Sequence, residues 1–339
     1  MTKREPILVT GCAGFIGMHI SLKLLRKNFE VFGIDNLNNY YDVKIKKSRL
    51  KLLLKYKNFK FFKKDLKNKK TLENIFKKKK FEKIVHLAAQ AGVRYSILNP
   101  KNYLENNVDA FLNILEFCKL KKIKHLIYAS SSSVYGINKK FPFSEEHETN
   151  HPISVYAVTK KTNELMAHTY SKLFNIPTTG IRFFTVYGPY GRPDMALFKF
   201  TKNILKNKSI EVFNKGEMYR DFTYIDDTVD ALFKIIIKKP KKNKTFNPYK
   251  PKPNISDCNY KIFNIGNNKS IKLSKFIKIL EKEIKLKAKK KYLSMQMGDV
   301  KSTVASNKFL NKWINQKKAT PHSLGIRKFV KWYLSYFKI

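Results

Sequence analysis

A glycine-rich turn close to the N-terminus decides the fold class. It reads Thr10-Gly11-Cys12-Ala13-Gly14-Phe15-Ile16-Gly17 and follows directly on the apolar segment Ile7-Leu8-Val9. We interpret residues 7–10 as a buried parallel strand and predict a helix from the turn to about Lys27. Residues 30–35 have the composition of a second strand, so the three elements form a β-α-β unit of the expected length.

Strand-like and helix-like segments continue to alternate as far as residue 183. Further strands are predicted at 59–62, 83–87, 124–129 and 178–183, and helices at 102–119 and 155–174. Regular alternation of this kind predicts the α/β class, with a doubly wound parallel sheet of the Rossmann type and right-handed crossovers.

The pattern loosens beyond residue 185, which indicates a second, smaller unit. Residues 240–259 are rich in Lys, Pro and Asn and are predicted to form a surface loop. Residues 262–266 resemble a late strand of the first sheet. We therefore expect a Rossmann domain at 1–184, with a later strand near 262–266, and a substrate lobe formed mainly by 185–339 and interleaved with it.

The composition is that of a globular protein with an unusual charge. Hydrophobic residues make up 43% of the 339 residues, and the formal net charge is +45 at pH 7. Such a charge alone suggests a nucleic acid or an anionic membrane as partner. The lysines are spread along the whole chain, however, and no basic arm or zinc-finger spacing is present. We favour codon bias acting on solvated positions, and expect weak adhesion to polyanions but no specific nucleic-acid partner.

Cysteine usage and hydropathy make several other classes improbable. Cys12, Cys118 and Cys258 have no metal-like spacing, so no metal site or disulfide is expected. No apolar run is long enough to cross a bilayer, so no membrane partner is expected. Glycines interrupt the apolar stretch near Met1, which argues against a signal peptide. A cytoplasmic protein is the expectation.

The glycine turn predicts a dinucleotide site. Gly11 permits the tight turn, Gly14 lets the backbone approach a pyrophosphate, and Gly17 lets the helix pack on the strand. Phe15 and Ile16 lie at the start of that helix, whose N-terminus faces the anion. Asp35 ends the next strand. A carboxylate there accepts both ribose hydroxyls of NAD and repels the 2′-phosphate of NADP, which predicts NAD as the cofactor. The alternative is a structural turn with a loop aspartate.

Two strand ends supply weaker candidates for cofactor contacts. Asp65 and Leu66 follow the third predicted strand and could touch the adenine. Ala88 and Ala89 follow the fourth, where small side chains would let the backbone come near the cofactor. For these four residues ordinary strand-end packing is almost as good an interpretation.

The candidate catalytic residues are Tyr156, Lys160 and Ser131. Tyr156 and Lys160 lie four residues apart on a predicted helix and so share a face. A free tyrosine titrates at about pH 10, and a nearby ammonium favours its phenolate, which can then act as a base. Lys160 can also hold the nicotinamide ribose. Tyr-x-x-x-Lys is common by chance, but Ser131 ends the preceding strand, where its hydroxyl can share the same substrate oxygen.

Together these features resemble the extended short-chain dehydrogenase/reductase family. The resemblance covers nearly the whole chain and is most specific for the branch of UDP-glucuronate 4-epimerases. It is carried by four stretches, which are 86–96 (HLAAQAGVRYS), 128–136 (YASSSSVYG), 182–196 (RFFTVYGPYGRPDMA) and 220–227 (RDFTYIDD).

The resemblance implies a reaction. Tyr156 takes the proton of the 4-hydroxyl while C4 gives a hydride to NAD, and a 4-keto sugar results. The sugar turns over and receives the hydride on its other face. UDP-glucuronate would become UDP-galacturonate, and NAD would be regenerated.

The residues beside Ser131 distinguish the epimerases of the family from its dehydratases and decarboxylases. Dehydratases of the family carry Asp-Glu where this chain has Ser132-Ser133, and decarboxylases that make UDP-xylose usually carry Glu at Ser133. Here two hydroxyls can hydrogen-bond a sugar carboxylate without adding charge, although a turn that caps the strand remains the alternative. Thr185 replaces an Asn of many relatives and is a further candidate for the carboxylate.

Three arginines and one aspartate within or near the matched stretches are candidate substrate contacts. Arg94 and Arg192 are assigned to the sugar and its carboxylate, and Arg220 to the diphosphate, because a planar guanidinium suits such anions. In so basic a chain each could instead be a surface charge. Asp299 resembles the region that binds the uridine ribose, although the family usually has Pro where this chain has Met297.

The resemblance also implies a homodimer, since the helices matching 102–119 and 155–173 pair as a four-helix bundle in the family. The alternative is that their apolar faces pack only on the sheet. Other functions stay open: a UDP-glucose or UDP-N-acetylglucosamine 4-epimerase, a UDP-glucuronate decarboxylase, and an inactive NAD-binding or polyanion-binding protein.

Overall fold

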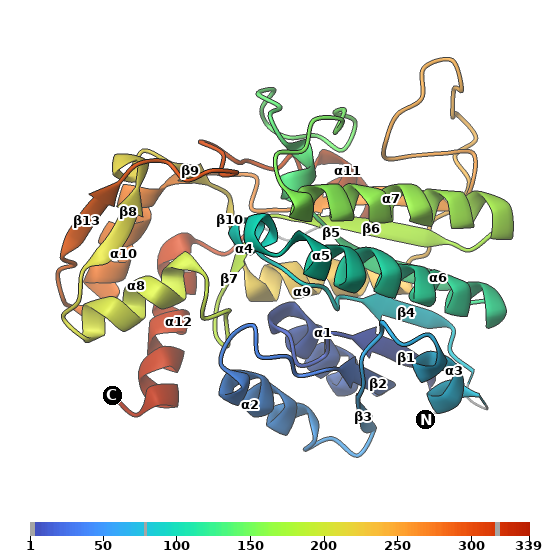
Figure 1. The fold of residues 1–339 in the computed structure, drawn as a ribbon, viewed down its shortest axis with the longest axis horizontal. Coiled ribbons are helices and arrows are strands. Elements are labelled where there is room, and N and C mark those ends of the chain that lie inside the picture. Colours follow the sequence, from blue (N-terminus) through green and yellow to red (C-terminus); the bar gives the residue numbers. More distant parts are fainter. Residues whose placement is uncertain (1–3, 78–79, 316–318) are drawn as a thin grey trace.

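A seven-stranded sheet in which all neighbouring strands run parallel forms the centre of the molecule (Figure 1). The computed structural model describes residues 4–77, 80–315 and 319–339. The strand order is β11-β6-β5-β4-β1-β2-β3. Their bounds are β1 Arg4–Thr10, β2 Phe29–Asp35, β3 Phe59–Lys63, β4 Lys83–His86, β5 His125–Ser131, β6 Thr178–Phe183 and β11 Tyr260–Ile265. The prediction of an α/β doubly wound parallel sheet is therefore confirmed.

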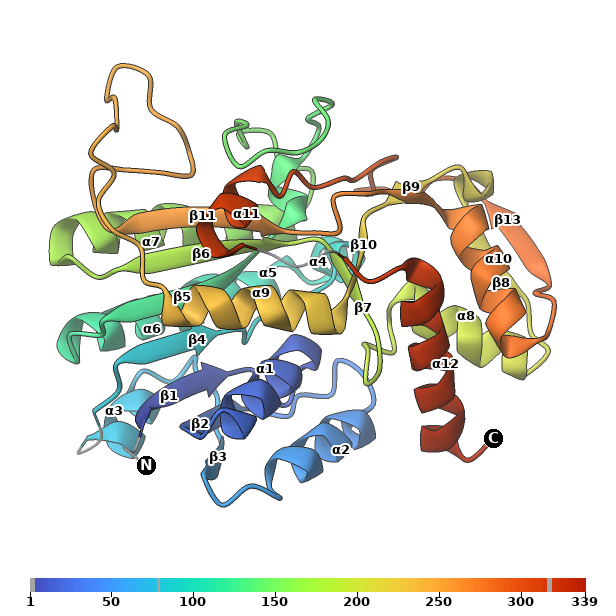
Figure 2. The ribbon, with the colours of Figure 1, turned by 180° about the vertical axis from the view of Figure 1, so that it is seen from behind.

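Helices cover both faces of this sheet, which explains the continuous apolar runs of its strands. Figure 1 shows α3 (Lys70–Phe76), α6 (Ala110–Leu120) and α7 (Val155–Phe174) on one face. Figure 2 shows α1 (Phe15–Arg26) and α9 (Ile225–Ile237) on the other. Ile7 and Val9 pack into the core of one face and Leu8 into the core of the other, and all three are buried. Each strand thus contributes to two hydrophobic layers.

The helix predicted at 102–119 differs from a regular α-helix. It begins with α5 (Pro100–Tyr103), passes through a π-helical turn at Leu104–Asp109 and continues as α6. Asn107 lies in this wider turn, and its side chain is buried. It accepts from the backbone N–H of Gln90 and donates to the carbonyl oxygen of the same residue. Such turns frequently occur at functional sites. The regular helical period could not predict this local change.

A smaller lobe is attached at the carboxyl ends of the strands. It contains three two-stranded pairings, which are β7 (Thr185–Tyr187) with β10 (Phe222–Tyr224), β8 (Ile210–Phe213) with β13 (Lys290–Leu293), and β9 (Tyr219–Arg220) with β12 (Ile271–Lys272). Its helices are α8 (Ala196–Leu205), α10 (Leu273–Ile284) and α12 (His322–Phe337). Phe198 and Phe329 join α8 to α12 in one aromatic cluster.

The chain returns from the lobe to the sheet. The strand expected near 262–266 is β11, which pairs in parallel with β6. Helix α9 packs on α1, and α11 (Lys308–Ile314) packs on β11, so both also belong to the sheet layer (Figure 2). The chain after residue 184 thus contributes two helices to the sheet layer in addition to the predicted strand β11. The domain boundary at residues 184/185 remains a prediction.

The long connection between β5 and α7 is tied down by a buried polar network. Tyr135 donates from its hydroxyl to Asn264 Oδ1 at 2.7 Å, and the backbone N–H of Asn264 donates to Glu145 Oε1 at 2.8 Å. The other carboxylate oxygen of Glu145 is buried without a hydrogen-bond partner among the described residues. Burial raises the pKa of Glu145 to about 7. Ionisation of this group therefore opposes folding.

Replacing Glu145 with glutamine should change how stability depends on pH. The pKa of Glu145 lies above its unfolded value, so the wild-type protein loses stability as the pH rises through the interval between about 4.5 and 7. Glutamine does not titrate. Relative to wild type, E145Q should gain about 2 to 3 kcal/mol in free energy of unfolding between pH 5 and pH 8. Urea unfolding at the two pH values measures this, and an unchanged difference between the two proteins contradicts it.

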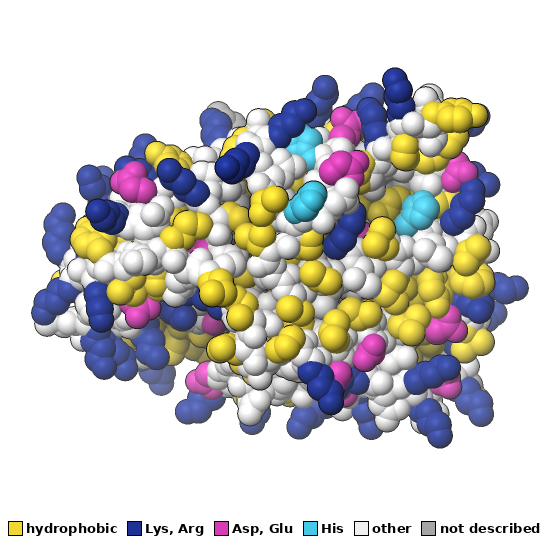
Figure 3. All heavy atoms as spheres, turned by 45° about the horizontal axis from the view of Figure 1, so that its top comes forward, with side chains coloured by type: hydrophobic (Ala, Val, Ile, Leu, Met, Phe, Trp, Pro, Cys, Tyr) yellow, Lys and Arg dark blue, Asp and Glu magenta, His cyan; other side chains and the backbone are white. Residues whose placement is uncertain are grey.

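Basic side chains lie mainly along the edges of one face of the molecule, with hydrophobic side chains between them (Figure 3). The three cysteines are buried and free. Within the described ranges, no helix is both long and apolar enough to span a membrane. The same residues hold no group of three or more His, Cys, Asp or Glu side chains placed for a metal ion.

Candidate active site

A cleft of about 1020 Å³ lies at the carboxyl ends of the parallel strands, between the sheet and the smaller lobe. This is where open α/β sheets bind their ligands. Every site residue predicted from the sequence lines this cleft: Gly11, Gly14, Phe15, Ile16, Gly17, Asp35, Asp65, Leu66, Ala88, Ala89, Arg94, Ser131, Ser132, Ser133, Tyr156, Lys160, Thr185, Arg192, Arg220 and Asp299. The structure thus brings the candidates together, although their individual roles remain predictions.

The glycine turn forms a bare backbone cradle at the start of α1. Gly11 has φ +68°, and a Cβ there would lie 2.7 Å from the backbone nitrogen of Ala88. A Cβ on Gly17 would overlap the carbonyl oxygen of Gly11. Gly14 is the N-cap, so no side chain accepts from the first N–H groups of the helix, and no acidic residue lies in its first turn. An anion such as a pyrophosphate fits this helix end.

Asp35 faces the cleft from the end of β2, as the dinucleotide prediction requires. Its carboxylate accepts from the backbone N–H of Ala13 at 3.1 Å and of Leu37 at 2.8 Å. Burial raises the pKa of Asp35, and these backbone donors oppose that rise. Asp65 lies close by, where it accepts from Asn36 Nδ2 at 3.1 Å. The two carboxylates give one end of the cleft the acceptors that ribose and adenine need.

The segment after β4 is held in place from the neighbouring helices. Asn107 accepts from the backbone N–H of Gln90 at 2.7 Å and donates to the carbonyl oxygen of Gln90 at 3.0 Å. It also donates to the hydroxyl of Thr159 on α7 at 3.0 Å. The π-helical turn therefore fixes the loop that contains Ala88 and Ala89 against the helix that carries Tyr156 and Lys160.

Tyr156 and Lys160 project from α7 into the centre of the cleft. Lys160 is buried and donates to the carbonyl oxygen of Ala129 at 2.9 Å. Burial lowers the pKa of Lys160 to about 8. Burial also raises the pKa of Tyr156, while the hydroxyl of Ser131 and the positive charge of Arg192 act in the opposite direction. These neighbours favour the phenolate that a catalytic base requires.

The serine cluster combines a buried, turn-capping hydroxyl with two that are half-buried. Ser131 Oγ accepts from the backbone N–H of Ser133 at 3.1 Å and donates to Ser133 Oγ at 3.1 Å. Ser131 thus caps the short 3₁₀ turn Ser132–Tyr135. The turn-capping role considered for Ser132 and Ser133 belongs to Ser131, while all three serines still line the cleft with Thr185 at the start of β7. No carboxylate stands at positions 132 and 133.

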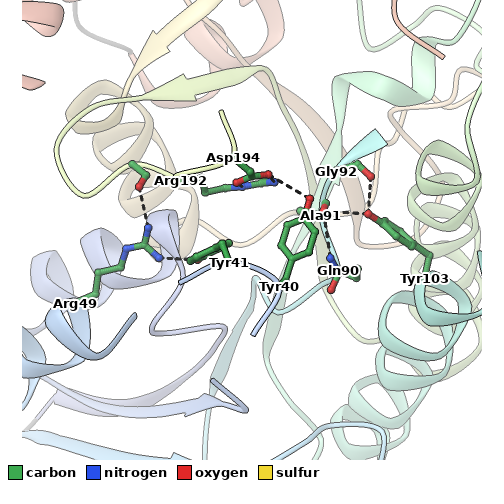
Figure 4. A network of polar contacts seen from close by, with 10 residues as sticks. Tyr40, Tyr41, Arg49, Gln90, Ala91, Gly92, Tyr103, Arg192 and Asp194 are labelled. Atoms are coloured by element: carbon green, nitrogen blue, oxygen red, sulfur yellow. Dashed lines mark hydrogen bonds and ion pairs between the residues drawn. The ribbon is translucent and has the colours of Figure 1, made fainter. Parts of the chain in front are cut away.

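Arg192 is oriented by an ion pair that the sequence did not suggest. Its Nε and Nη2 donate to Asp194 at 3.0 and 2.5 Å, and Tyr40 donates its hydroxyl to the same carboxylate at 3.3 Å (Figure 4). Beside this group, the fully buried Arg49 donates to the carbonyl oxygens of Tyr190 and Gly191. The connection between β2 and β3 and the segment 190–194 therefore meet around Arg192.

Arg220 and Asp299, which were assigned separate roles, contact each other. Arg220 Nη2 donates to Asp299 Oδ1 at 2.7 Å, and Arg94 lies at 3.9 Å from the other oxygen of Asp299. The guanidinium of Arg94 also lies 4.8 Å from the ring centroid of Phe213. These residues line the end of the cleft that lies in the smaller lobe. An anion entering there meets two guanidinium groups held by one carboxylate.

Sequence reasoning missed the connection between β2 and β3. This connection contains α2 (Val43–Leu53) and several residues of the cleft wall, namely Asn36, Asn38, Tyr40, Tyr41 and Lys46. One available signal was Asp42, whose side chain caps α2 by accepting from the backbone N–H of Lys44. The apolar spacing of Ile45, Leu50 and Leu53 was a second.

The family assignment rests on a match over most of the chain. Residues 7–249 match the model of the NAD dependent epimerase/dehydratase family. The chain belongs to this family. The membership accords with the predicted resemblance, and NAD is the cofactor that the glycine cradle and Asp35 fit. The chain is thus an NAD-dependent nucleotide-sugar epimerase.

Similar proteins cover nearly the whole chain. "Protein CapI" of Staphylococcus aureus is 50% identical over 98% of this chain and 99% of its own length. "UDP-glucuronate 4-epimerase 4" of Arabidopsis thaliana is 44% identical over 98% of this chain and 76% of its own length. The crystal structure of a UDP-glucuronic acid 4-epimerase from Bacillus cereus, in complex with UDP-glucuronic acid and NAD, is 32% identical with a TM-score of 0.86. It covers 98% of this chain and 99% of that one.

Proposed function

We propose that the protein interconverts UDP-glucuronate and UDP-galacturonate through a 4-keto intermediate. The observation that carries this proposal is the lining of the cleft around Tyr156, where hydroxyls and Arg192 stand together and no acidic side chain occupies positions 132 and 133. Hydroxyls and a guanidinium can bind a carboxylate, whereas an acidic side chain would repel it. The similarity to UDP-glucuronate 4-epimerases of Arabidopsis thaliana and Bacillus cereus supports the same substrate.

The chain's own residues divide the chemistry between proton transfer and orientation. NAD, when bound, supplies the acceptor and donor of a hydride. Tyr156 accepts the proton of the sugar 4-hydroxyl and later returns it, and the Ser131 hydroxyl donates to the same oxygen. Lys160 supplies a buried ammonium that favours the phenolate. Each group lines the cleft, so no rearrangement of the fold is required to assemble them.

The carboxylate must also be kept from leaving as carbon dioxide. A 4-keto uronate is a β-keto acid, and it loses its carboxylate most readily when the bond to the carboxyl carbon stands perpendicular to the plane of the ketone. Ser132, Ser133 and Thr185 offer three hydroxyls that can hold it in one orientation. Epimerisation without decarboxylation follows from this restraint.

A second candidate substrate is an uncharged UDP-sugar such as UDP-glucose or UDP-N-acetylglucosamine. The observation in its favour is that Arg192 is already paired with Asp194, which neutralises much of its charge. A decarboxylase is less well supported because it would need an acid near Ser133.

Nuclear magnetic resonance of the purified protein with UDP-glucuronate and no added cofactor tests the proposal. We expect UDP-galacturonate to appear without carbon dioxide and without net NADH. Release of carbon dioxide would contradict the role given to Ser132 and Ser133. No turnover even with added NAD would rule out UDP-glucuronate as substrate, and the same assay with UDP-glucose then tests the second candidate.

We further propose that the protein is a homodimer formed through α6 and α7. These adjacent helices present exposed apolar side chains, which are Leu112 and Leu120 on α6 and Val158, Leu165 and Leu173 on α7. Figure 3 shows hydrophobic side chains gathered across the middle of the face that these helices reach. Contiguous exposed apolar surface of this kind marks an interaction site.

Replacing Leu165 with glutamate should separate the two subunits. Leu165 is 58% exposed in the single chain, so the change should not disturb the fold, but a dimer would bury an unpaired carboxylate. We expect the dimer dissociation constant to rise by more than about 100-fold, which sedimentation velocity measures. Leu286→Glu, at a similarly exposed leucine beyond α10, is the control and should stay dimeric. A wild-type protein that sediments as a monomer would overturn the assignment.

A further inference from the structure

Asp194 lines the cleft but does not belong to the proposed proton-transfer group. Its carboxylate binds the Nε/Nη2 edge of Arg192 in a two-point ion pair. A guanidinium has a second edge, formed by Nη1 and Nη2, that can bind another carboxylate. With the first edge held by Asp194, only the second edge can meet a ligand. Asp194 thereby decides which way Arg192 faces.

Asp194 is itself held from the opposite wall of the cleft. Tyr40 donates to Asp194 Oδ2 at 3.3 Å, and Figure 4 shows its side chain reaching across from the connection after β2. The Tyr40 hydroxyl lies where a Cβ on Gly92 would be 2.5 Å away, so this path exists because residue 92 is glycine. The Tyr40 ring also packs on Tyr95, with centroids 5.0 Å apart. These contacts limit how far Asp194 can move.

The connection that carries Tyr40 is held by several side-chain hydrogen bonds and lies on the cofactor side of the cleft. Lys46 is buried and donates to the carbonyl oxygen of Asn38 at 2.7 Å and to its side-chain oxygen at 2.6 Å. Just before Asn38 in the chain, Asn36 donates from its side chain to Asp65, and Leu37 donates from its backbone N–H to Asp35. A continuous set of contacts therefore joins the predicted ribose site to Asp194.

Arg49 holds the backbone of the segment that precedes Arg192. Its guanidinium donates to the hydroxyl of Tyr41 (Figure 4). It also donates to the carbonyl oxygens of Ala13 in the glycine turn, Tyr190 and Gly191. Arg192 directly follows Gly191 in the chain. The backbone on one side of Arg192 and the carboxylate that binds its side chain are thus both fixed by residues of the cofactor half.

We propose that Asp194, supported by Tyr40, is a positioning residue that sets the selectivity of the cleft for a sugar carboxylate by fixing the orientation of Arg192. This inference rests on the proposed function. An uncharged sugar does not need Arg192, so its binding should be insensitive to the loss of Asp194. A uronate needs the free edge of the guanidinium in one place, and a misplacement of about 1 Å at such a contact costs up to about 100-fold in rate.

The test compares wild type with D194N and Y40F as holoenzymes, using UDP-glucuronate as substrate and UDP-glucose as competitive inhibitor. We expect D194N to lower kcat/KM for UDP-glucuronate by about 10- to 100-fold and to leave the inhibition constant of UDP-glucose within about twofold. Y40F should also lower kcat/KM for UDP-glucuronate, by about 3- to 10-fold, because it removes one hydrogen bond to Asp194. The inhibition constant of UDP-glucose should again stay unchanged. D194E, which keeps a carboxylate, should recover part of the loss.

Tyr170→Phe is the matched control, because it also removes a tyrosine hydroxyl that donates to a carboxylate, here Glu116 at 2.5 Å, away from the cleft. Y170F should change neither kcat/KM for UDP-glucuronate nor the inhibition constant of UDP-glucose. If D194N weakens UDP-glucuronate turnover and UDP-glucose binding equally, Asp194 is merely structural and the inference is overturned. An unchanged kcat/KM overturns it as well. A wild-type protein without activity on UDP-glucuronate instead rejects the proposed function, and the inference with it.

Discussion

Tyr156→Phe should lower kcat for the epimerisation by about 10²- to 10⁴-fold, the range measured when a general acid–base group is lost. Tyr156 lines the centre of the cleft, and its ring packs edge-on against Tyr103 with centroids 6.1 Å apart. Phenylalanine keeps this packing and removes only the hydroxyl. The expected loss is therefore chemical and leaves the fold and the cleft intact.

Cofactor and substrate binding distinguish this result from a general disturbance. Y156F should retain as much NAD as wild type, because the glycine turn and Asp35 are unaffected, and should bind UDP-glucuronate with a similar dissociation constant. Absorbance of the released cofactor and titration calorimetry measure the two quantities. Tyr170→Phe serves again as a control with full activity. Full activity in Y156F would remove Tyr156 from its assigned role as base.

Glu164→Gln should lower the free energy of unfolding by about 3 to 5 kcal/mol, as breaking one partner of a buried ion pair does. Glu164 and Arg182 are both fully buried, and two hydrogen bonds of 2.9 Å join them. Ser130 also donates to Glu164, at 2.6 Å. The variant leaves Arg182 charged and without an ionised partner in the core.

The same pair predicts a dependence on pH. Burial acts to raise the pKa of Glu164, but the facing guanidinium of Arg182 brings it below its usual value. Its stabilising contribution is therefore complete above the ordinary glutamate pKa of about 4.3 and is lost as the pH falls below it. In E164Q this part of the acid sensitivity should be absent.

An exposed ion pair supplies the control for this measurement. Glu217 pairs with Lys272, and their side chains are 53% and 35% exposed, so E217Q should leave the free energy of unfolding nearly unchanged because water screens such pairs. Urea unfolding at pH 7 compares both variants with wild type. Equal effects of E164Q and E217Q would show that the buried pair contributes no more than an exposed one.

The parts of the fold that local sequence predicts are those whose side chains follow a simple period. The strands β1, β4 and β5 were found because they contain runs of apolar residues that are buried on both faces of the sheet. Tyr156 and Lys160 were found because neighbours on one helix face are separated by a fixed number of residues. Helix α2 escaped prediction because its buried face includes Lys46 and Arg49, which interrupt the apolar period.

Contacts between distant segments could not be predicted in this way. Tyr40 and Asp194 are 154 positions apart and meet only because two loops end on opposite walls of one cleft. The pairing of Arg220 with Asp299 likewise depends on how the short strands of the lobe pack. A pattern within a single segment contains no information on such meetings.

The late return of the chain to the sheet has a consequence for how the protein acquires its fold. Strand β11 pairs with β6 along Tyr260–Ile265, and α9 covers α1 from more than two hundred positions away. While the ribosome is still making the lobe, one edge of the sheet is therefore open and one face of α1 is bare. Such non-local contacts slow folding and leave unpaired strand edges exposed in the meantime. A chain stopped short of β11 should consequently depend on chaperones or aggregate, even though it contains the glycine turn, Tyr156 and Lys160.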